Sequence, residues 1–248
     1  MKPTLLKTIR NVRDLGGIPA AGGCAAVKPR RLIRSAHLGG ASDEDLLTLR
    51  QEHSLAAVLD LRTEQERLEK PDRAEGFAYF AIPVIDDLRA GITHEQAAEE
   101  KEFPDMAFLY RLMITRPATQ AGFARALHRI FTWDYSQGAM LWHCTEGKDR
   151  CGMTTALVLE ALGVDRDTIL QDYLETNRTS LLRARGVYER LLPLRGEVFA
   201  RSVYRAYVAD ERYLRAAWDA MGENYLTDTL QIPQAEIDSF RWQVLTGQ

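Results

Sequence analysis

The residues of this chain with the clearest capacity for chemistry lie in one short run, His143-Cys-Thr-Glu-Gly-Lys-Asp-Arg150. An apolar stretch precedes the run and a stretch with helical spacing follows it, which predicts a strand, a short loop and a helix. Backbone N–H groups at the start of a helix point out of its end and, with the helix dipole, form a site for an anion. A cysteine held there beside an arginine, as Cys144 and Arg150 are, has its thiolate stabilised, and the thiolate is the nucleophilic form. The run therefore predicts nucleophilic attack on a bound anion.

The anion that this loop fits best is a phosphate group. The guanidinium of Arg150 presents its N–H groups in a planar fork that can hold two phosphate oxygens at once. The loop is long enough to wrap around one phosphate, so the candidate phosphate-binding residues are Thr145, Glu146, Gly147, Lys148, Asp149 and Arg150. A nucleotide-binding P-loop is excluded, because Asp149 follows Lys148 where that motif has Ser or Thr, and Trp142 occupies the place of its first Gly.

Composition and charge restrict the other function classes. With 46% hydrophobic and 27% charged residues, the chain has the composition of an ordinary soluble globular protein. Its net charge of -3 argues against a general nucleic-acid or membrane-surface binder. The N-terminus lacks the apolar core of a signal peptide, and no apolar run approaches the roughly 20 residues of a membrane span. We therefore expect a cytoplasmic protein with no integral membrane segment, while export without a signal peptide and the oligomeric state stay open.

Cysteine and histidine usage points away from disulfides and metals. The three cysteines, Cys24, Cys144 and Cys151, are too few and too scattered for a disulfide framework. No metal-ligand spacing appears among them and the five histidines. We therefore expect reduced cysteines and no metal site.

The elements that must position the loop follow an α/β pattern, in which short apolar runs alternate with amphipathic stretches. We predict strands at 32–35, 56–60, 77–84 and 139–143, and helices that begin at Ser42, at Thr63 and at Asp165 or cover 108–114, 121–131 and 153–162. The charged, poorly apolar segment 86–105 predicts a lid insertion, and 165–248 is mostly helical. We expect one domain over 1–248, with a mainly parallel central sheet flanked by helices and the loop at the C-terminal edge of that sheet.

The run His143-Cys144-x-x-Gly147-Lys148-Asp149-Arg150-x-Gly152 resembles the active-site signature of the bacterial tyrosine and phosphoinositide phosphatases, a family of cysteine-dependent phosphatases. Other parts of the chain resemble elements of that family in the same order. They are Asn11-Val-Arg-Asp-Leu-Gly-Gly17, Leu32-Ile-Arg-Ser35, Asp60-Leu-Arg62 and Asp172-Tyr-Leu-Glu-Thr-Asn177. The resemblance covers roughly residues 9 to 180.

The resemblance implies a two-step hydrolysis of phosphate monoesters that needs no metal or organic cofactor. Cys144 attacks phosphorus and forms a phosphocysteine, the leaving oxygen takes a proton, and water then releases phosphate. The implied substrate is phosphotyrosine on a protein, with phosphoserine, phosphothreonine or phosphoinositides as further candidates. A phosphate-binding module without activity would have lost the nucleophile or the clamp, and Cys144 and Arg150 are both present.

The general acid has more than one candidate. The resemblance implies Asp149, inside the loop. Common tyrosine phosphatases carry the acid on a mobile loop in a Trp-Pro-Asp motif, which Phe103-Pro-Asp105 imitates, although Pro104 and Asp105 also make a good helix start. Asp86, Asp87 or water alone stay open as well.

Four further side chains have more than one interpretation. His143 either hydrogen-bonds nearby backbone and orients Cys144, or is a structural residue at a strand end. Lys148 either adds a second positive charge over the loop or is a solvated lysine. A carboxylate at the mouth of the loop, as Glu146 provides, would repel polyanions if it faces the pocket. Asp60 is expected to cap the next helix or to orient Arg62.

Cys151 departs from the resemblance, because cysteine phosphatases usually have Ser or Thr directly after the arginine. That hydroxyl steadies the cysteine as it leaves in the second step, and a thiol is a poorer donor, so we predict slow hydrolysis of the phosphocysteine. The second thiol also keeps an alternative function open, a thiol redox enzyme or an arsenate-reductase-like activity that uses Cys144 and Cys151. A reversible disulfide between these two cysteines would protect Cys144 from over-oxidation.

Overall fold

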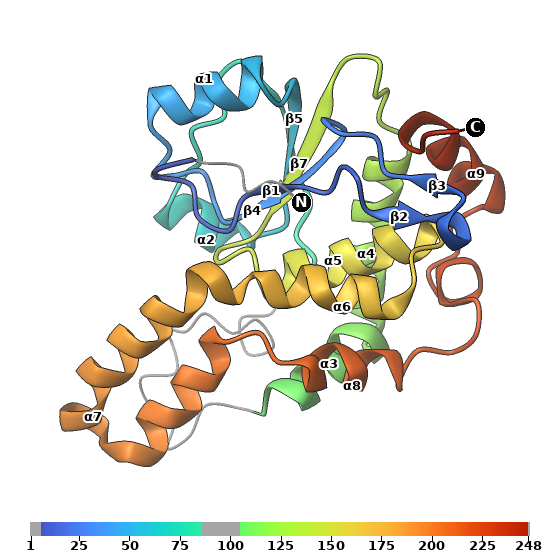
Figure 1. Cartoon of the computed structure of the whole chain (residues 1–248). Helices are drawn as coiled ribbons and strands as arrows, with labels where there is room; N and C mark the ends of the chain where they lie inside the picture. The colour runs from blue at the N-terminus through green and yellow to red at the C-terminus, as the bar shows by residue number, and fades with distance from the viewer. Residues whose placement is uncertain (1–5, 86–104, 248) are drawn as a thin grey trace.

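The computed structural model describes residues 6–85 and 105–247 of the chain. Its centre is a five-stranded sheet with strand order β1-β4-β7-β5-β6 (Figure 1). In that order the strands are Arg13–Asp14, Leu32–Ser35, Ala139–His143, Leu55–Asp60 and Ala78–Ala81. Strands β4, β7, β5 and β6 are parallel, and β1 pairs antiparallel with β4 at one edge. The predicted α/β fold with a mainly parallel sheet is confirmed.

The central strand β7 is buried along its whole length, as its continuous apolar run predicts for a strand covered on both faces. Met140 and Trp142 contribute to the larger hydrophobic cluster of the protein. Ala139 and Leu141 contribute to a smaller cluster, which also contains Leu49. The sheet therefore has apolar packing on both sides, and Cys144 directly follows its central strand β7.

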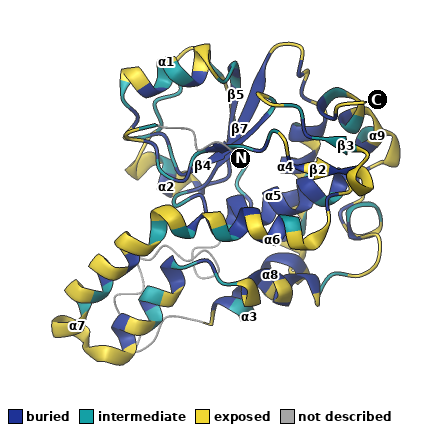
Figure 2. Cartoon of the chain, viewed as in Figure 1, coloured by how far each residue is buried: buried dark blue, intermediate teal, exposed yellow. Residues whose placement is uncertain are grey.

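Helices surround this sheet. They are α1 Asp43–Gln51, α2 Glu64–Glu69, α3 Met106–Thr115, α4 Pro117–Phe131, α5 Asp149–Ala161, α6 Arg166–Glu175, α7 Asn177–Tyr207, α8 Glu211–Trp218 and α9 Gln234–Val244. A π-helical turn covers Tyr225–Thr229, and a small antiparallel pair, β2 Pro19–Ala20 and β3 Ala25–Ala26, flanks the 3-10 turn Ala21–Gly23. Figure 2 shows α5 buried along most of its length, whereas α7 is largely exposed. None of the described helices is long and apolar enough to cross a membrane.

The helix N-caps follow the predictions from sequence. Ser42, Thr63 and Asp165 each accept a hydrogen bond from a backbone N–H in the first turn of the helix that follows. Three predictions of extent were wrong by more than two residues. The strand predicted at 77–84 is the shorter β6. The helices predicted at 121–131 and 153–162 each begin four residues earlier, at Pro117 and Asp149. The first turn of α5 consists of loop residues without apolar periodicity, so the pattern did not predict it.

Segment 11–23 contains the two short strands β1 and β2. The predicted lid at 86–105 lies outside the described residues except for Asp105. Near the C-terminal end, α7 bends at Gly196, whose φ of 78° is the left-handed conformation that glycine adopts readily. The two arms fold back on each other (Figure 1), and the rings of Tyr188 and Tyr204 meet across them with centroids 6.2 Å apart.

Candidate active site

The loop that carries Cys144 joins the end of β7 to the start of α5, at the C-terminal edge of the parallel strands. Gly147 has a φ of 68°, and a Cβ atom at this position would lie 2.4 Å from the carbonyl oxygen of Ser35. Only glycine fits this position without displacing β4. The Cys144 side chain is buried, with the residue 2% exposed.

The backbone of this loop has unused hydrogen-bond donors. Among the described residues, no protein acceptor receives a hydrogen bond from the backbone N–H groups of Thr145, Glu146, Gly147, Lys148, Asp149 or Arg150. Backbone donors that lack a protein partner are normally satisfied by water or a ligand. With the N-terminal end of the α5 dipole behind them, these donors form a cradle for an anion beside Cys144.

The carbonyl of Gly147 is held from behind by two residues of the recognised motifs. Arg34 donates from Nη2 at 2.9 Å, and Asn11 donates from Nδ2 at 2.8 Å. Asp172 in turn accepts from Arg34 Nη1 and from Arg13 Nε, both at 2.7 Å. Burial alone would raise the pKa of Asp172, but the two arginines outweigh it and hold that pKa below its usual value. The motifs 11–17, 32–35 and 172–177, which are far apart in sequence, thus together hold the loop 144–150 at the carbonyl of Gly147.

His143, which precedes Cys144, is anchored by a buried charged cluster. Its Nε2 lies 3.0 Å from Asp72 Oδ2, and its Nδ1 lies 3.2 Å from the carbonyl oxygen of Cys144, as expected from the sequence. Burial disfavours the charged imidazole, but Asp60 and Asp72 raise the pKa of His143 above its ordinary value. Arg62 pairs with Asp60, as predicted, and also with Asp72, at 2.7 Å each. The cap of α2 is Thr63, not Asp60.

Asp60, Asp72 and His143 also bring three potential metal ligands within 4.8 Å of one another. The guanidinium of Arg62 already pairs with both carboxylates, so the positive charge that a metal ion would bring is supplied by the protein. This donor set therefore fits a structural ion-pair cluster rather than a metal centre.

Glu66 is a partner of Arg150 that the sequence did not reveal. Its two carboxylate oxygens accept from Arg150 Nη1 and Nη2 at 2.6 and 2.7 Å, and the same carboxylate accepts from the hydroxyl of Thr145. Burial would raise the pKa of Glu66, but the hydrogen bonds and charge of Arg150 lower it to about 2. This role could not be predicted from the sequence, because Glu66 also closes the capping box with Thr63, which alone explains a glutamate there.

Asp149 lies at the edge of the loop with its side chain 18% exposed. Its Oδ1 accepts from the hydroxyl of Tyr110 at 2.8 Å and lies 3.2 Å from Lys148 Nζ. The sequence suggested that Lys148 is either a second positive charge over the loop or a solvated lysine. Both interpretations were wrong. Lys148 is 1% exposed, and its ammonium donates to the carbonyl of Ala206 and lies 5.7 Å from the ring centroid of Tyr213. Its charge therefore points toward the junction of α7 and α8.

Glu146 does not present an uncompensated negative charge. Its carboxylate pairs with Arg10 at 3.0 Å and with Arg183 of α7 at 3.2 Å. The three side chains line a small pocket beside the loop, together with polar residues of α7 such as Thr179 and Ser180. Two positive charges against one negative leave this pocket with an excess of positive charge, so the expected repulsion of polyanions is offset.

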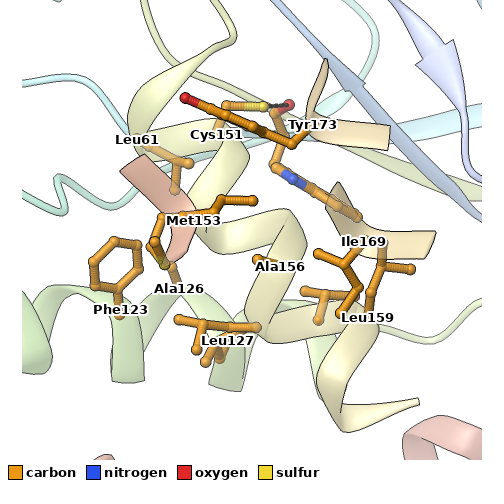
Figure 3. Close-up of a cluster of buried hydrophobic side chains, with 14 of the residues drawn as sticks. Leu61, Phe123, Ala126, Leu127, Cys151, Met153, Ala156, Leu159, Ile169 and Tyr173 are labelled. Atoms are coloured by element: carbon orange, nitrogen blue, oxygen red, sulfur yellow. Dashed lines mark hydrogen bonds between the residues drawn. The ribbon is translucent and has the colours of Figure 1, made fainter. Parts of the chain in front are cut away.

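Cys151 lies in the apolar core, as Figure 3 shows. It is fully buried, its thiol donates to the carbonyl of Trp142 at 3.6 Å, and burial raises its pKa to about 11. Cys24, Cys144 and Cys151 are all free thiols. The neighbouring Gly152 leaves room for Tyr173, because a Cβ atom there would lie 3.1 Å from that ring.

The other candidates for the general acid are Asp105, Asp86 and Asp87. Asp105 is exposed and caps α3, where its Oδ1 accepts from the N–H of Ala107 at 3.1 Å. The helix start predicted at this position is confirmed, and it accounts for Asp105 without a catalytic role. Asp86 and Asp87 lie outside the described residues.

Comparison with known proteins gives the family. A tyrosine phosphatase family model matches residues 4–246. A putative tyrosine-protein phosphatase of Cupriavidus necator is 34% identical over 253 residues, which cover 93% of this chain and 85% of that protein. The triple specificity protein phosphatase PtpB of Mycobacterium tuberculosis is 34% identical over 201 residues, which cover 70% and 72%.

Among solved structures, the core catalytic domain of the PP-IP phosphatase SIW14 from S. cerevisiae matches with a TM-score of 0.40 and 15% identity. That match covers 89% of this chain and 97% of the other, and it is too distant to bear on activity. The family model, in contrast, matches almost the whole chain, and the resemblance predicted from the sequence is confirmed. The chain belongs to the tyrosine phosphatase family.

Proposed function

We propose that this phosphatase hydrolyses phosphotyrosine with Cys144 as nucleophile, Arg150 as phosphate clamp and Asp149 as general acid. The observation that carries the proposal is the run of backbone N–H groups from Thr145 to Arg150, which directly follows Cys144 and has no acceptor within the described part of the chain. Such a run of donors binds the phosphate and stabilises the negative charge that its oxygens gain in the transition state. The loop residues Thr145, Glu146, Gly147 and Lys148 contribute backbone donors rather than side-chain charges.

The first step transfers the phosphoryl group to the protein. The Cys144 thiolate attacks phosphorus, the S–P bond forms and the P–O bond to the leaving group breaks. The leaving oxygen takes a proton from Asp149. Arg150 turns two nitrogens toward Glu66, while its Nε–H takes part in none of the described contacts and is available to a phosphate oxygen.

The second step releases phosphate. Water attacks phosphorus and gives a proton to the Asp149 carboxylate, while the S–P bond breaks and the Cys144 thiolate leaves. Supporting roles belong to His143, which holds the carbonyl of Cys144, and to Gly152, which makes room for Tyr173. Neither step calls for a metal or an organic cofactor.

Phosphoinositides are the second candidate substrate. The specific observation is the pocket beside the loop, where Arg10 and Arg183 outnumber the single carboxylate of Glu146. A substrate with a second phosphate gains from that excess of positive charge, which a phosphotyrosine peptide does not need. The relative from M. tuberculosis, described as triple specificity, supports testing several phosphoester classes.

A side-by-side assay of phosphate release tests the function. We expect vanadate-sensitive turnover of phosphotyrosine peptides, with lower rates on phosphoserine and phosphothreonine peptides and a measurable rate on phosphoinositides. Inorganic arsenate with a thiol reductant serves as the control for the redox alternative. Arsenate reduction without phosphate release from any ester would overturn the proposal.

The buried position of Cys151 weakens the redox alternative. The attacking form in disulfide exchange is the thiolate, and a pKa of about 11 leaves very little thiolate on Cys151 at neutral pH. A protective disulfide with Cys144 is disfavoured for the same reason.

Cys151→Ser is therefore expected to raise turnover. Serine fits the space and is a stronger donor than a thiol. When its hydroxyl turns toward Cys144 and away from the carbonyl of Trp142, which the Cys151 thiol contacts, it steadies the leaving thiolate in the second step. One hydrogen bond of about 1 kcal/mol corresponds to a gain of about fivefold. Rapid-quench kinetics on p-nitrophenyl phosphate should show a smaller burst of p-nitrophenol in the variant. Equal turnover and no burst in either protein would mean that the second step does not limit the rate.

A further inference from the structure

Two buried tyrosines, Tyr110 and Tyr173, form a chain of hydrogen bonds that ends at Asp149. The hydroxyl of Tyr110, on α3, lies 2.8 Å from Asp149 Oδ1 and 2.7 Å from the hydroxyl of Tyr173, on α6. Tyr110 is fully buried and Tyr173 is 1% exposed, whereas the Asp149 side chain is 18% exposed. The three groups form a chain that leads from the core to the edge of the phosphate cradle.

The direction of the hydrogen bonds in this chain follows from their chemistry. Burial, followed by the negative charge of Asp149, raises the pKa of Tyr110 well above its usual value, so its hydroxyl keeps its proton. Tyr110 has one proton to donate and two neighbouring oxygens, of which the carboxylate is the stronger acceptor. Tyr110 therefore donates to Asp149 Oδ1, and Tyr173 donates to Tyr110.

Asp149 Oδ1 is thus occupied by two donors, because Lys148 Nζ also lies 3.2 Å from it. Among the described residues, Asp149 Oδ2 accepts no hydrogen bond, so it is the oxygen left to carry an exchangeable proton. A carboxyl group with one oxygen fixed by donors has its rotation restricted, which holds the other oxygen in one place.

We propose that Tyr110 is the positioning residue of Asp149, and that Asp149 delivers the proton to the leaving oxygen from Oδ2. The inference rests on the proposed function, since it needs Asp149 as the general acid. As the P–O bond breaks, the proton moves from Oδ2 to the leaving oxygen, and the new carboxylate charge is met by the hydroxyl of Tyr110 and the ammonium of Lys148. Because these donors bind the charged form more strongly than the neutral form, they favour the proton transfer.

The groups that face Asp149 come from four elements. Tyr110 comes from α3, Tyr173 from α6, Tyr213 from α8, and Lys148 and Arg150 from its own segment. Tyr213 differs from Tyr110 in one useful respect. Its ring lies 5.6 Å from that of Tyr110, but its hydroxyl donates to the carbonyl of Arg205 at 3.1 Å.

Tyr110→Phe tests the proposal, with Tyr213→Phe as the matched control. Both changes remove one hydroxyl and keep the ring in the same aromatic cluster. For phenyl phosphate, a poor leaving group that needs the proton, Tyr110→Phe should lower kcat/KM by roughly tenfold to a hundredfold, the scale of one hydrogen bond to a charged group. For p-nitrophenyl phosphate, whose leaving group needs little protonation, the loss should be several times smaller.

The dependence of kcat/KM on the leaving group provides the readout that a merely structural role would not move. Across a series of aryl phosphates, kcat/KM should fall more steeply with rising pKa of the leaving phenol in Tyr110→Phe than in the unaltered protein. Tyr173→Phe should change this slope in the same direction by less, and Tyr213→Phe should leave it unchanged. Equal losses across the whole series would overturn the positioning role of Tyr110.

Asp149→Asn separates this inference from the proposed function. If Asp149 is the acid, that variant loses far more activity on phenyl phosphate than on p-nitrophenyl phosphate, and adding Tyr110→Phe to it costs little more. If Asp149→Asn behaves in this way but Tyr110→Phe matches the Tyr213→Phe control, the positioning role alone fails. If Asp149→Asn loses equally on both substrates, the assignment of the acid fails first.

Discussion

Cys144→Ser is expected to lower turnover by roughly 10⁵-fold or more, the scale seen when a covalent nucleophile is removed. A serine hydroxyl at this position stays protonated at neutral pH, and the described residues offer no base within hydrogen-bond distance of the Cys144 side chain to activate it. Binding should survive, because the proposed anion site consists of the loop N–H groups and Arg150 rather than the sulfur. Calorimetric titration with a phosphotyrosine peptide measures the retained affinity.

Cys24→Ser is the matched control, since Cys24 is the exposed free thiol of this chain. It should keep full turnover and full binding, which separates the loss of the nucleophile from the general effect of a Cys-to-Ser change. Appreciable turnover in Cys144→Ser, beyond what contaminating phosphatase explains in mass-verified protein, would contradict the phosphocysteine mechanism.

The fold could be predicted to the extent that local sequence determines it. The strands β4, β5 and β7 are continuous apolar runs, and the helices that begin after Ser42, Thr63 and Asp165 carry side chains that cap them. The start of α5 could not be predicted in this way. Its first turn consists of polar loop residues that form no apolar stripe. The position of the helix start depends instead on the hydrogen bonds that Asn11 and Arg34 donate to the carbonyl of Gly147.

In the candidate site too, some residues could be predicted from the local sequence and others could not. Cys144 and Arg150 could be predicted because the loop is contiguous and its chemistry depends on residue type. The direction of a side chain at a helix start depends on partners distant in sequence, which is why Lys148 was misjudged and why Glu66 and Tyr110 were missed. The local sequence offers another explanation for each of them: Lys148 as a charged loop residue, Glu66 as a capping residue and Tyr110 as an apolar residue of a helix.

The buried ion pairs of Arg13 and Arg34 with Asp172 show what the recognised motifs do. Burying charges carries a desolvation penalty that their attraction only partly offsets, so such pairs are weak evidence for stability. Their arrangement is better explained by position, since Arg34 joins Asp172 of α6 to the carbonyl of Gly147 in the loop. The charged cluster of Asp60, Arg62 and Asp72 is explained by position as well, since Arg62 pairs with both aspartates and Asp72 contacts His143.

Arg150→Lys is expected to lower kcat/KM by about 10³-fold, comparable to the loss of a strong donor to a developing oxyanion. The guanidinium of Arg150 does two things at once. Its Nη1 and Nη2 bind the two oxygens of Glu66, and Nη2 also donates to Thr145 Oγ1 at 3.3 Å, while its Nε–H has no partner among the described residues and is available to the phosphate. A lysine ammonium is a point charge that cannot satisfy both partners in fixed directions, and Glu66 would draw it away from the phosphate. Steady-state kinetics on a phosphotyrosine peptide measures the loss.

Glu66→Gln separates the orientation of the clamp from the clamp itself. Glutamine keeps the capping box of α2 and can still accept one hydrogen bond from Arg150, so the fold and the guanidinium both remain. Loss of one charged hydrogen bond predicts a decrease of about tenfold in kcat/KM, well short of that in Arg150→Lys. Near-normal activity in Arg150→Lys would show that Arg150 is not the phosphate clamp. A loss in Glu66→Gln as large as that in Arg150→Lys would instead show that the clamp works only when Glu66 holds it in place.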